Sequence, residues 1–431
     1  MKEFRGNPGY DELVQKSEKL IAKAFGRYTQ IPVESGKGVY LYDTAGNRYL
    51  DFTAGIATCN VGHCHPEVVE AIKKQAEKVI HLMDHIGYYQ PYVNLVEKVN
   101  GLLPEGFKDA AAFLVNGGSE AVEVAIKLAR MVTGRPIILS FLGAFHGRTM
   151  GALSVTASNM IYKVGLGGLF TGVHHVPFPF DPDRKKEDLT KESLGFMRTL
   201  LSTAVHPDDV AAVIIEPIQG ESGYRIPPDD FLPKLRELCD EFGFLLIFDE
   251  IQTGFGRTGK MFALEHWGVE PDVICLAKAF GGGLPLSAMF AKQELNQKWR
   301  PAAHGSTFGG NPLAIAASST SIDIILRDNL VENSREMGGY LVELIEKERN
   351  RVSAIGEVRG KGLMIAVDIL DKDGKPFENC KDILYRAAEK GLVLSTCGTN
   401  SIRICPPLII NKSHVEEGVK ILVEAIAEIV E

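Results

Sequence analysis

Between residues 110 and 290 the chain alternates short apolar runs with helical segments, and this pattern restricts the fold more than any other feature. The apolar runs are AFLV, PIILS, GALSVT, VAAVIIE, FLLIFDE and DVICLAK, and the helical segments include residues 119–131. Such alternation is typical of βαβ units, which build a mostly parallel sheet covered on both faces. Ligands of these sheets bind outside the carboxyl ends of the strands. We therefore expect functional residues at strand ends, where Glu216, Asp249 and Lys278 stand.

The rest of the chain predicts a second, smaller domain of helices and strands. A helix is expected over residues 11–25, followed by a hairpin in GVYLYDTAGNRYLDF and a helix that begins at Pro66. After Pro312 two long helices are expected, and then strands in VRGKGLMIAVDIL, LVLSTC and SIRICPPLII. The predicted domains are residues 1–60 as the N-terminal segment of the small domain, 61–325 as the large domain and 326–431 as the C-terminal small α+β domain.

The bulk properties exclude several classes of protein. A chain of 431 residues, 45% hydrophobic and 24% charged, is typical of a soluble protein with more than one domain. Its net charge of −8 argues against a nucleic-acid or membrane partner. The apolar run at 242–248 is too short to cross a bilayer, and the N-terminus lacks a signal-peptide core. With seven scattered cysteines, we predict a cytoplasmic protein with reduced thiols.

Two motifs resemble ligand sites without meeting their chemistry. The string GFGRTGKM at 254–261 satisfies G-x-G-x-x-G, but Met261 stands where a P-loop needs Ser or Thr, and no helical pattern opens at Gly259. We interpret it as a glycine-rich surface loop. The His63-Cys64-His65 string has no third ligand at a usable interval and precedes a helix start, so no metal site is expected.

A different set of residues matches the needs of one cofactor. Lys278 follows a buried strand, where an ammonium is costly unless it is paired or neutralised. Asp249 ends the strand FLLIFDE, and Lys278 ends the next strand but one, so both can reach one crevice. Pyridoxal phosphate requires a lysine that forms an imine and an acid that keeps its pyridine nitrogen protonated. Residues 116–119, NGGS, precede a helix and would cradle its phosphate.

Six segments resemble, in order and spacing, the class III (ω-amino acid) aminotransferases of pyridoxal-phosphate fold type I. They are NGGSEAVEVAIKLAR, FHGRTMGALSVT, IIEPIQGESG, FDEIQTGFGRTGK, LAKAFGGGLP and HGSTFGGNP, within a resemblance that runs from about Gly38 to Leu408. The resemblance implies an α/β fold, with a mostly parallel sheet of the seven-stranded type in a large domain and a small α+β domain. It also implies a homodimer. Within the family the chain looks closest to 4-aminobutyrate aminotransferases, through GIATCNVGHCHPEV and three charged residues described below.

The resemblance assigns the cofactor-binding residues. Lys278 would form the imine and shuttle the proton, and Asp249 would pair with the pyridinium nitrogen. The other cofactor-binding residues that it implies are Gly118 and Ser119 at the phosphate, Phe145 stacked on the ring, His146 at the cofactor, Glu216 in support, Ile251 under the ring, Gln252 near the 3′ oxygen and Thr307, which would reach the phosphate of the neighbouring subunit.

The same resemblance assigns the substrate-binding residues. Arg148 would bind the distal carboxylate of an ω-amino acid or of glutamate, since a guanidinium binds a carboxylate through two hydrogen bonds. Arg403 would bind the α-carboxylate of glutamate or 2-oxoglutarate. Glu221 would pair with Arg403 when the substrate lacks that carboxylate, so that no buried charge is left unpaired. Ile56 would line the substrate pocket.

The reaction implied is a ping-pong transfer of an amino group from an ω-amino donor, with 4-aminobutyrate expected, to a keto acid acceptor, with 2-oxoglutarate expected. Aminotransferases that act on acetylornithine or ornithine, on putrescine or on β-amino acids share nearly every motif, as do pyruvate-linked enzymes, and stay open as alternatives. A pyridoxal-phosphate-dependent amino-acid racemase on the same scaffold also stays open. A nucleotide-binding protein that uses the glycine-rich loop is disfavoured by Met261.

Overall fold

The computed structural model describes residues 9–24, 26–169 and 171–430. These residues form two compact units, which are described separately here. The large unit comprises Glu67–Phe255 and Lys260–Ile324. The small unit comprises three stretches of described residues, which run up to Pro66, from Gly256 to Gly259 and from Ile325 onward.

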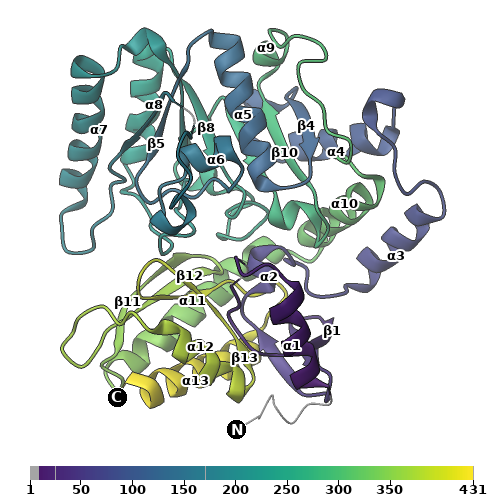
Figure 1. The fold of residues 1–431 in the computed structure, drawn as a ribbon, viewed down its shortest axis with the longest axis vertical. Helices are drawn as coiled ribbons and strands as arrows, with labels where there is room; N and C mark the ends of the chain where they lie inside the picture. The colour runs from purple at the N-terminus through teal and green to yellow at the C-terminus, as the bar shows by residue number, and fades with distance from the viewer. Residues whose placement is uncertain (1–8, 25, 170, 431) are drawn as a thin grey trace. The chain divides into compact units, whose positions relative to one another are not determined.

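A seven-stranded sheet forms the centre of the large unit (Figure 1). Its strands are β4 (Ala111–Val115), β5 (Ile137–Phe141), β6 (Val173–Val176), β7 (Val210–Ile215), β8 (Leu245–Asp249), β9 (Val273–Leu276) and β10 (Ser287–Ala291). They lie in the order β4-β10-β9-β8-β7-β5-β6, and only β10 runs antiparallel to its neighbours. Every residue of β7 and β9 is buried, as expected for strands covered on both faces. The predicted mostly parallel sheet is confirmed.

Helices of the large unit cover this sheet. Helix α5 (Gly118–Thr133) buries an apolar face that shares one core with residues of β7, β8 and β9. Its buried positions recur at helical spacing, which is why this segment forms an amphipathic helix. The other helices that lie wholly or mainly in this unit are α3 (Pro66–Ala76), α4 (Gln90–Asn100), α6 (Met150–Val155), α7 (Lys186–Thr203), α8 (Phe231–Phe242), α9 (Gln293–Asn296) and α10 (Pro312–Arg327).

Two sequence expectations about this unit are wrong. The run GALSVT, expected as a strand, forms helix α6, whose residues from Gly151 to Val155 are all buried. The spacing of apolar residues alone does not distinguish a short helix that is buried on every side from a buried strand. The carboxylate of Glu123 accepts hydrogen bonds from the N–H groups of Gly151 and Ala152, which stabilises the helix start. The second concerns the strand before Lys278. This strand, β9, pairs directly with β8, the strand that ends in Asp249, and is therefore its neighbour and not the next strand but one.

The small unit contains two four-stranded sheets. One has the order β1-β2-β3-β13 and the other β11-β12-β15-β14. The strands are β1 (Val33–Lys37), β2 (Tyr40–Asp43), β3 (Arg48–Asp51), β11 (Ile355–Lys361), β12 (Met364–Ile369), β13 (Leu392–Val393), β14 (Ser395–Cys397) and β15 (Ser401–Ile404), and the helices are α1 (Tyr10–Leu20), α2 (Ala54–Ala57), α11 (Leu330–Arg349), α12 (Cys380–Lys390) and α13 (Lys412–Val430). Strands β2 and β3 form the predicted antiparallel hairpin.

The glycine-rich loop is buried, which corrects the expectation of a surface loop. Arg257 has none of its surface exposed. Its guanidinium donates to the carbonyl oxygens of Leu363 at 2.9 Å and Pro406 at 2.6 Å, and to Asn60 Oδ1 at 2.6 Å. The loop therefore holds three distant segments of the small unit together, and its glycines admit backbone with positive φ, as at Gly259.

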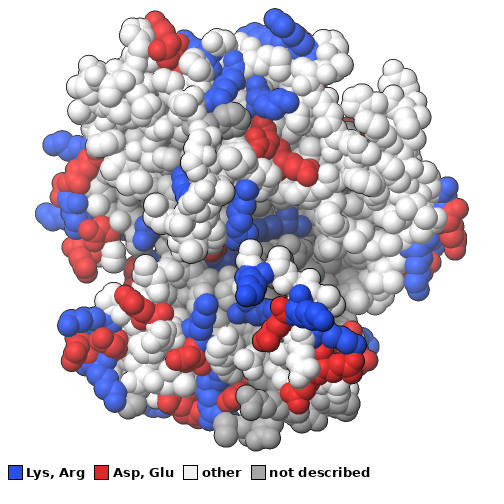
Figure 2. All heavy atoms as spheres, in the orientation of Figure 1, with Lys and Arg blue, Asp and Glu red and all other residues white. Residues whose placement is uncertain are grey.

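The described surface carries charges of both signs. Figure 2 shows basic and acidic side chains interspersed over the visible face. Among the described helices, none combines the length and the apolarity that crossing a bilayer requires.

Candidate active site

Three predicted residues lie at the same edge of the seven-stranded sheet. Asp249 is the last residue of β8, Glu216 follows β7, and Lys278 comes two residues after β9. Because β7, β8 and β9 are parallel neighbours, their carboxyl ends meet at one edge. Lys278 has a φ of 48°, a left-handed conformation that is uncommon for a residue with a Cβ. Such backbone conformations concentrate at functional sites.

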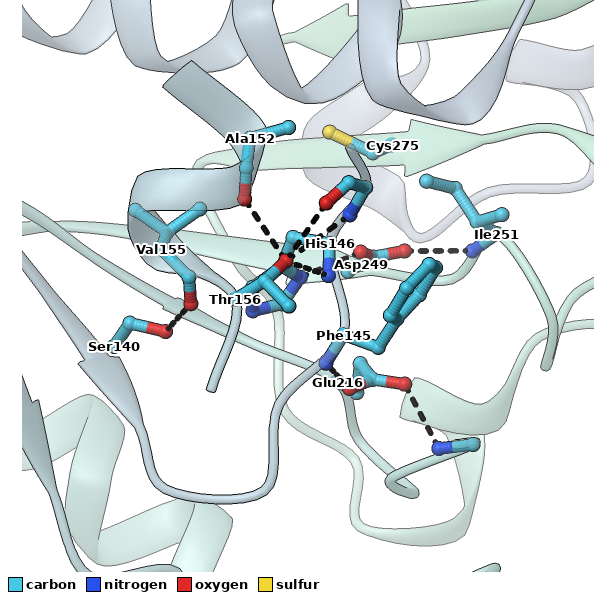
Figure 3. Close-up of polar contacts among 12 residues, drawn as sticks. Ser140, Phe145, His146, Ala152, Val155, Thr156, Glu216, Asp249, Ile251 and Cys275 are labelled. Carbon is cyan, nitrogen blue, oxygen red and sulfur yellow. Dashed lines mark hydrogen bonds and ion pairs between the residues drawn. The ribbon is translucent and has the colours of Figure 1, made fainter. Parts of the chain in front are cut away.

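Asp249 is oriented by two neighbours (Figure 3). Its Oδ2 lies 2.6 Å from His146 Nδ1, and its Oδ1 accepts a hydrogen bond from the N–H of Ile251 at 3.1 Å. An ionised carboxylate only accepts, so the Nδ1 of His146 donates in this pair. His146 Nε2 is buried and makes no hydrogen bond to the described residues. The pair gives Asp249 a fixed direction while it stays 3% exposed.

Thr156 holds the segment that carries Phe145 and His146. Its hydroxyl oxygen accepts hydrogen bonds from the N–H of His146 at 2.9 Å and of Gly147 at 3.2 Å. It also lies 2.9 Å from the carbonyl oxygen of Ala152, to which it donates (Figure 3). Thr156 follows α6 directly, so the helix positions the hydroxyl. Sequence reasoning missed this residue because a threonine after an apolar run carries no local signature.

Glu216 supports the same segment from the neighbouring strand. Its two carboxylate oxygens accept hydrogen bonds from the N–H of Phe145 and of Gly220, each at 2.8 Å. Burial is the main cause that raises the pKa of Glu216, to about 7; the charge of His146 lowers this pKa and that of Asp249 raises it. The carboxylate therefore fixes the backbone at Phe145, whose ring is drawn beside it in Figure 3.

The raised pKa of Glu216 predicts a dependence of stability on pH. Near pH 4 the carboxyl group is protonated in both states, and as pH rises towards 7 only the unfolded state ionises freely. The free energy of unfolding is thus expected to fall by up to about 3 kcal/mol between pH 4.5 and 8 through this group. Glu216→Gln stays neutral and should remove this contribution, which urea unfolding of the cofactor-loaded enzyme at several pH values measures.

Glu250 provides the matched control. It is also buried, burial raises its pKa to about 7, and it accepts hydrogen bonds from the N–H groups of Ala263 and Leu264. Glu250→Gln should remove a pH-dependent contribution of similar size without moving Phe145. Equal pH slopes for the unmodified chain and Glu216→Gln would contradict the prediction.

The N-terminus of α5 offers an anion site. Its N-cap residue, Gly117, is extended, and no side chain caps the helix there, so the dipole and N–H groups of the first turn point outward. A Cβ at Gly118 would lie 3.0 Å from Ile251 Cδ1, which explains glycine at this position. Ser119 Oγ accepts a hydrogen bond from the N–H of Arg148 at 3.2 Å. Gly118 and Ser119 thus stand at a helix start suited to a phosphate.

The remaining cofactor-binding predictions lie in the same unit. Gln252 directly follows Ile251. Its side-chain Oε1 is buried and makes no hydrogen bond to the described residues. Thr307 is exposed on this chain. Three features suit pyridoxal phosphate. They are a lysine and an acid at one sheet edge, a helix start without a side-chain cap, and buried polar atoms of His146 and Gln252 that have no hydrogen-bond partner among the described residues. The residues present therefore fit this cofactor.

Arg148 packs against two aromatic rings. The central carbon of its guanidinium lies 5.0 Å from the ring centroid of Phe145 and 4.7 Å from that of Tyr162. The hydroxyl of Tyr162 donates to Glu221 Oε1 at 3.3 Å. Tyr162 thus brings together two predicted substrate residues, Arg148 and Glu221. The sequence alone does not predict the contacts of Tyr162 with Arg148 and Glu221, because a single aromatic residue in NMIYKVG belongs to no motif or hydrophobic repeat.

Ile56 and Arg403 belong to the small unit. Ile56 lies in the short helix α2 with a φ of 60°, again left-handed. Arg403 is only 1% exposed in β15, where its register partners are Ala366 and Ser395. A buried guanidinium is costly unless it is paired or hydrogen-bonded.

Comparisons with known proteins identify the class. Residues 22–426 match the aminotransferase class-III family. The chain is 38% identical to the 5-aminovalerate aminotransferase DavT of Pseudomonas putida over 97% of this chain and 99% of that protein. It is 40% identical to the acetylornithine aminotransferase of Methanosarcina mazei (97% of each chain) and 38% identical to the probable 4-aminobutyrate aminotransferase of Bacillus subtilis (95% of each).

Solved structures agree. An (S)-enantioselective ω-transaminase from Thermomicrobium roseum superposes with a TM-score of 0.91 at 30% identity and covers 99% of each chain. A pyridoxal-phosphate-bound amine transaminase from an uncultivated Pseudomonas species gives 0.86 at 33% identity over 92% of this chain and 94% of that one. The chain therefore belongs to the class III aminotransferases, which depend on pyridoxal phosphate. The predicted family, fold type and cofactor are confirmed.

Proposed function

We propose that this aminotransferase moves the terminal amino group of a short straight-chain ω-amino acid, with 4-aminobutyrate the expected donor, to 2-oxoglutarate. The observation that carries the proposal is the group formed by Arg148, Tyr162 and Glu221 in the large unit. A guanidinium held on aromatic rings presents its hydrogen-bond donors to a carboxylate. Relatives named for 5-aminovalerate and 4-aminobutyrate, both ω-amino acids, support the same donor class.

Bound pyridoxal phosphate supplies the electron sink for bond breaking at the substrate carbon. In this proposal Lys278 Nζ takes and returns the proton at that carbon, because a lysine in a desolvated site can act as a base near neutral pH. Asp249, held by His146 and the Ile251 N–H, would hold the ring nitrogen of the cofactor through its negative charge. Phe145 would pack on the ring, and Glu216 fixes the backbone of Phe145.

Two arginines would let one site accept two different substrates. 2-Oxoglutarate carries two carboxylates, whereas 4-aminobutyrate carries one. Arg148 binds the distal carboxylate common to both, and Arg403 binds the α-carboxylate of the keto acid. By the family resemblance, Glu221 would neutralise Arg403 while the donor is bound, and Ile56 would line the substrate pocket. Such an exchange avoids a buried charge without a partner in either half of the reaction.

A homodimer is part of the proposal, with Thr307 of one chain completing the phosphate site of the other. Thr307 is exposed on the single chain, as such a role requires. A cytoplasmic location stays a prediction from the composition.

Acetylornithine is the second candidate donor. It shares a terminal amine and a carboxylate with the ω-amino acids, and relatives from several archaea at 39–40% identity are named acetylornithine aminotransferases.

A half-reaction screen distinguishes the donors. The enzyme is mixed with 4-aminobutyrate, 5-aminovalerate, N-acetylornithine or putrescine, each without a keto acid, and the visible absorbance of the bound cofactor is followed. We expect 4-aminobutyrate to react with the highest second-order rate constant and putrescine, which lacks a carboxylate, to react slowly. A larger second-order rate constant for N-acetylornithine than for 4-aminobutyrate would make N-acetylornithine the donor. In the second half-reaction, the keto acid that restores the starting absorbance, 2-oxoglutarate or pyruvate, identifies the acceptor.

Replacing Arg148 tests its role directly. Arg148→Met should raise KM for both 4-aminobutyrate and 2-oxoglutarate roughly 10- to 100-fold, because a hydrogen bond to a charged group contributes about 1.5–3 kcal/mol. Arg148→Lys should recover part of the loss, since a lysine keeps the charge but not the paired hydrogen bonds. Putrescine is the internal control, and its rate should not change. An unchanged KM for both carboxylate substrates removes Arg148 from the proposed role.

A further inference from the structure

Two opposite charges in the large unit contact the same tyrosine without pairing with each other. The guanidinium carbon of Arg148 lies 4.7 Å from the ring centroid of Tyr162. The hydroxyl of Tyr162 donates a hydrogen bond to Glu221 Oε1 at 3.3 Å. Among the described residues, the guanidinium of Arg148 makes no ion pair and no hydrogen bond. Tyr162 therefore contacts a cation and a carboxylate that attract each other but stay apart.

The contacts of Arg148 leave its guanidinium able to bind a ligand. The residue is exposed, and its backbone N–H is fixed by the hydrogen bond to Ser119 Oγ at 3.2 Å. The guanidinium itself contacts the rings of Phe145 and Tyr162. A ring face attracts a cation but gives its N–H groups no oxygen acceptor. The guanidinium can therefore donate two hydrogen bonds to an incoming carboxylate.

A protein carboxylate close to this guanidinium would compete with the substrate. Glu221 is half-buried, and an ion pair with Arg148 would occupy the donors that a substrate needs. The hydroxyl of Tyr162 gives the Glu221 carboxylate a different partner. Hydrogen bonds to ionised groups are roughly twice as strong as those between neutral groups, so this contact opposes a turn of Glu221 towards Arg148.

Tyr162 is itself held in a fixed position. It ends a short 3₁₀ helix, Met160–Tyr162, and the side chain of Asn159 caps that helix by accepting a hydrogen bond from the N–H of Ile161 at 2.9 Å. Its ring packs edge-to-face on Phe145, with centroids 5.7 Å apart and planes at 68°. Ring and hydroxyl are thus directed at the same time, the ring towards Arg148 and the hydroxyl towards Glu221.

We propose that Tyr162 is a positioning residue that reserves Arg148 for substrate carboxylates by keeping Glu221 apart from it. The inference rests on the proposed role of Arg148 and gives the neighbouring tyrosine a task of its own. The ring supports the guanidinium, and the hydroxyl holds the carboxylate. Without the hydroxyl, Glu221 turns towards Arg148, and a substrate carboxylate must displace it before binding.

The test is a double-mutant cycle with Tyr162→Phe and Glu221→Gln in the cofactor-loaded enzyme. The dissociation constant of butyrate, measured by calorimetry, is the readout, because butyrate carries the carboxylate of 4-aminobutyrate but no amine and does not turn over. Tyr162→Phe should raise this constant about two- to fivefold, the range of an exposed ion pair that must be displaced. In the presence of Glu221→Gln the same change should have an effect of less than about 1.5-fold, because an amide carries no charge that competes.

Tyr162→Leu separates the ring from the hydroxyl. It should weaken butyrate binding by about two- to fivefold more than Tyr162→Phe does, and this added part should remain in the presence of Glu221→Gln, because it comes from the lost aromatic face. KM for 4-aminobutyrate should follow the same order with kcat unchanged, while the rate with putrescine, which lacks a carboxylate, should not change. Ile161→Val alters an exposed neighbour in the same 3₁₀ helix and is the matched control, with no change expected.

Equal effects of Tyr162→Phe with and without Glu221→Gln would overturn the proposal, because the hydroxyl would then act on the ligand or on the fold and not through the carboxylate. An unchanged dissociation constant in Tyr162→Phe would overturn it as well. Failure of the proposed function gives a different result. In that case Arg148→Met leaves butyrate binding unchanged, which removes both proposals, whereas failure of the Tyr162 inference alone leaves the effect of Arg148→Met intact.

Discussion

Replacing Lys278 with alanine is expected to lower the rate constant for amino transfer by about 10²- to 10⁴-fold, the range associated with loss of a positioned acid or base. The side chain also supplies the amine that links the chain to its cofactor in the proposed mechanism. Borohydride treatment followed by mass spectrometry should therefore attach the cofactor to the peptide containing Lys278 in the unmodified enzyme and to no peptide in Lys278→Ala. This readout does not depend on turnover.

Lys260 serves as the matched control. It is the exposed lysine within the otherwise buried glycine-rich loop. Lys260→Ala should keep both the rate and the borohydride-fixed cofactor. Attachment at a lysine other than Lys278 in the unmodified enzyme would remove the basis of the proposed mechanism.

Replacing Asp249 with asparagine is expected to have the second largest effect. The carboxylate is 3% exposed, and removing one member of a buried charged pair costs about 3–5 kcal/mol. Since about 1.4 kcal/mol corresponds to tenfold, we expect a loss of roughly 10²- to 4 × 10³-fold, divided between cofactor affinity and kcat. Cofactor retained after dialysis, measured by absorbance, reports the first part, and single-turnover rates at saturating cofactor report the second.

Asp272 is a suitable comparison for Asp249. It precedes β9 at the opposite end from Lys278, accepts a hydrogen bond from Arg236 Nη1 at 2.8 Å and another from the N–H of Leu246 at 2.8 Å. Asp272→Asn should lower stability without changing cofactor retention. If Asp249→Asn retains cofactor and rate as well as Asp272→Asn does, the proposed role of Asp249 is wrong.

The arrangement of the large sheet could be predicted because its signal is repeated. Several buried runs, each followed by helical spacing or a polar residue, specify parallel strands, and parallel strands bring their carboxyl ends to one edge. That reasoning predicts that Glu216, Asp249 and Lys278 lie at one edge of the sheet. It failed for α6, because a short apolar segment buried on all sides has no exposed face and therefore no period to detect.

The contacts that refine the site were beyond prediction because they join residues far apart in sequence. Thr156 contacts His146 across ten positions, and Tyr162 contacts Glu221 across 59. The local sequence around Arg257 predicts a glycine-rich surface loop, yet Arg257 donates hydrogen bonds to Leu363 and Asn60. Such pairings depend on tertiary packing, which propensity and spacing do not encode.

The placement of Arg257 has a consequence for dissecting the protein. The chain leaves the large unit after Phe255, contributes four residues to the small unit, and returns at Lys260. The small unit is thus assembled from three separate stretches of polypeptide, and the large unit from two. No single cut in the gene yields either unit with all of its parts. Fragments ending near Ile324 would lack the carbonyl oxygens of Leu363 and Pro406, which accept hydrogen bonds from the buried guanidinium of Arg257.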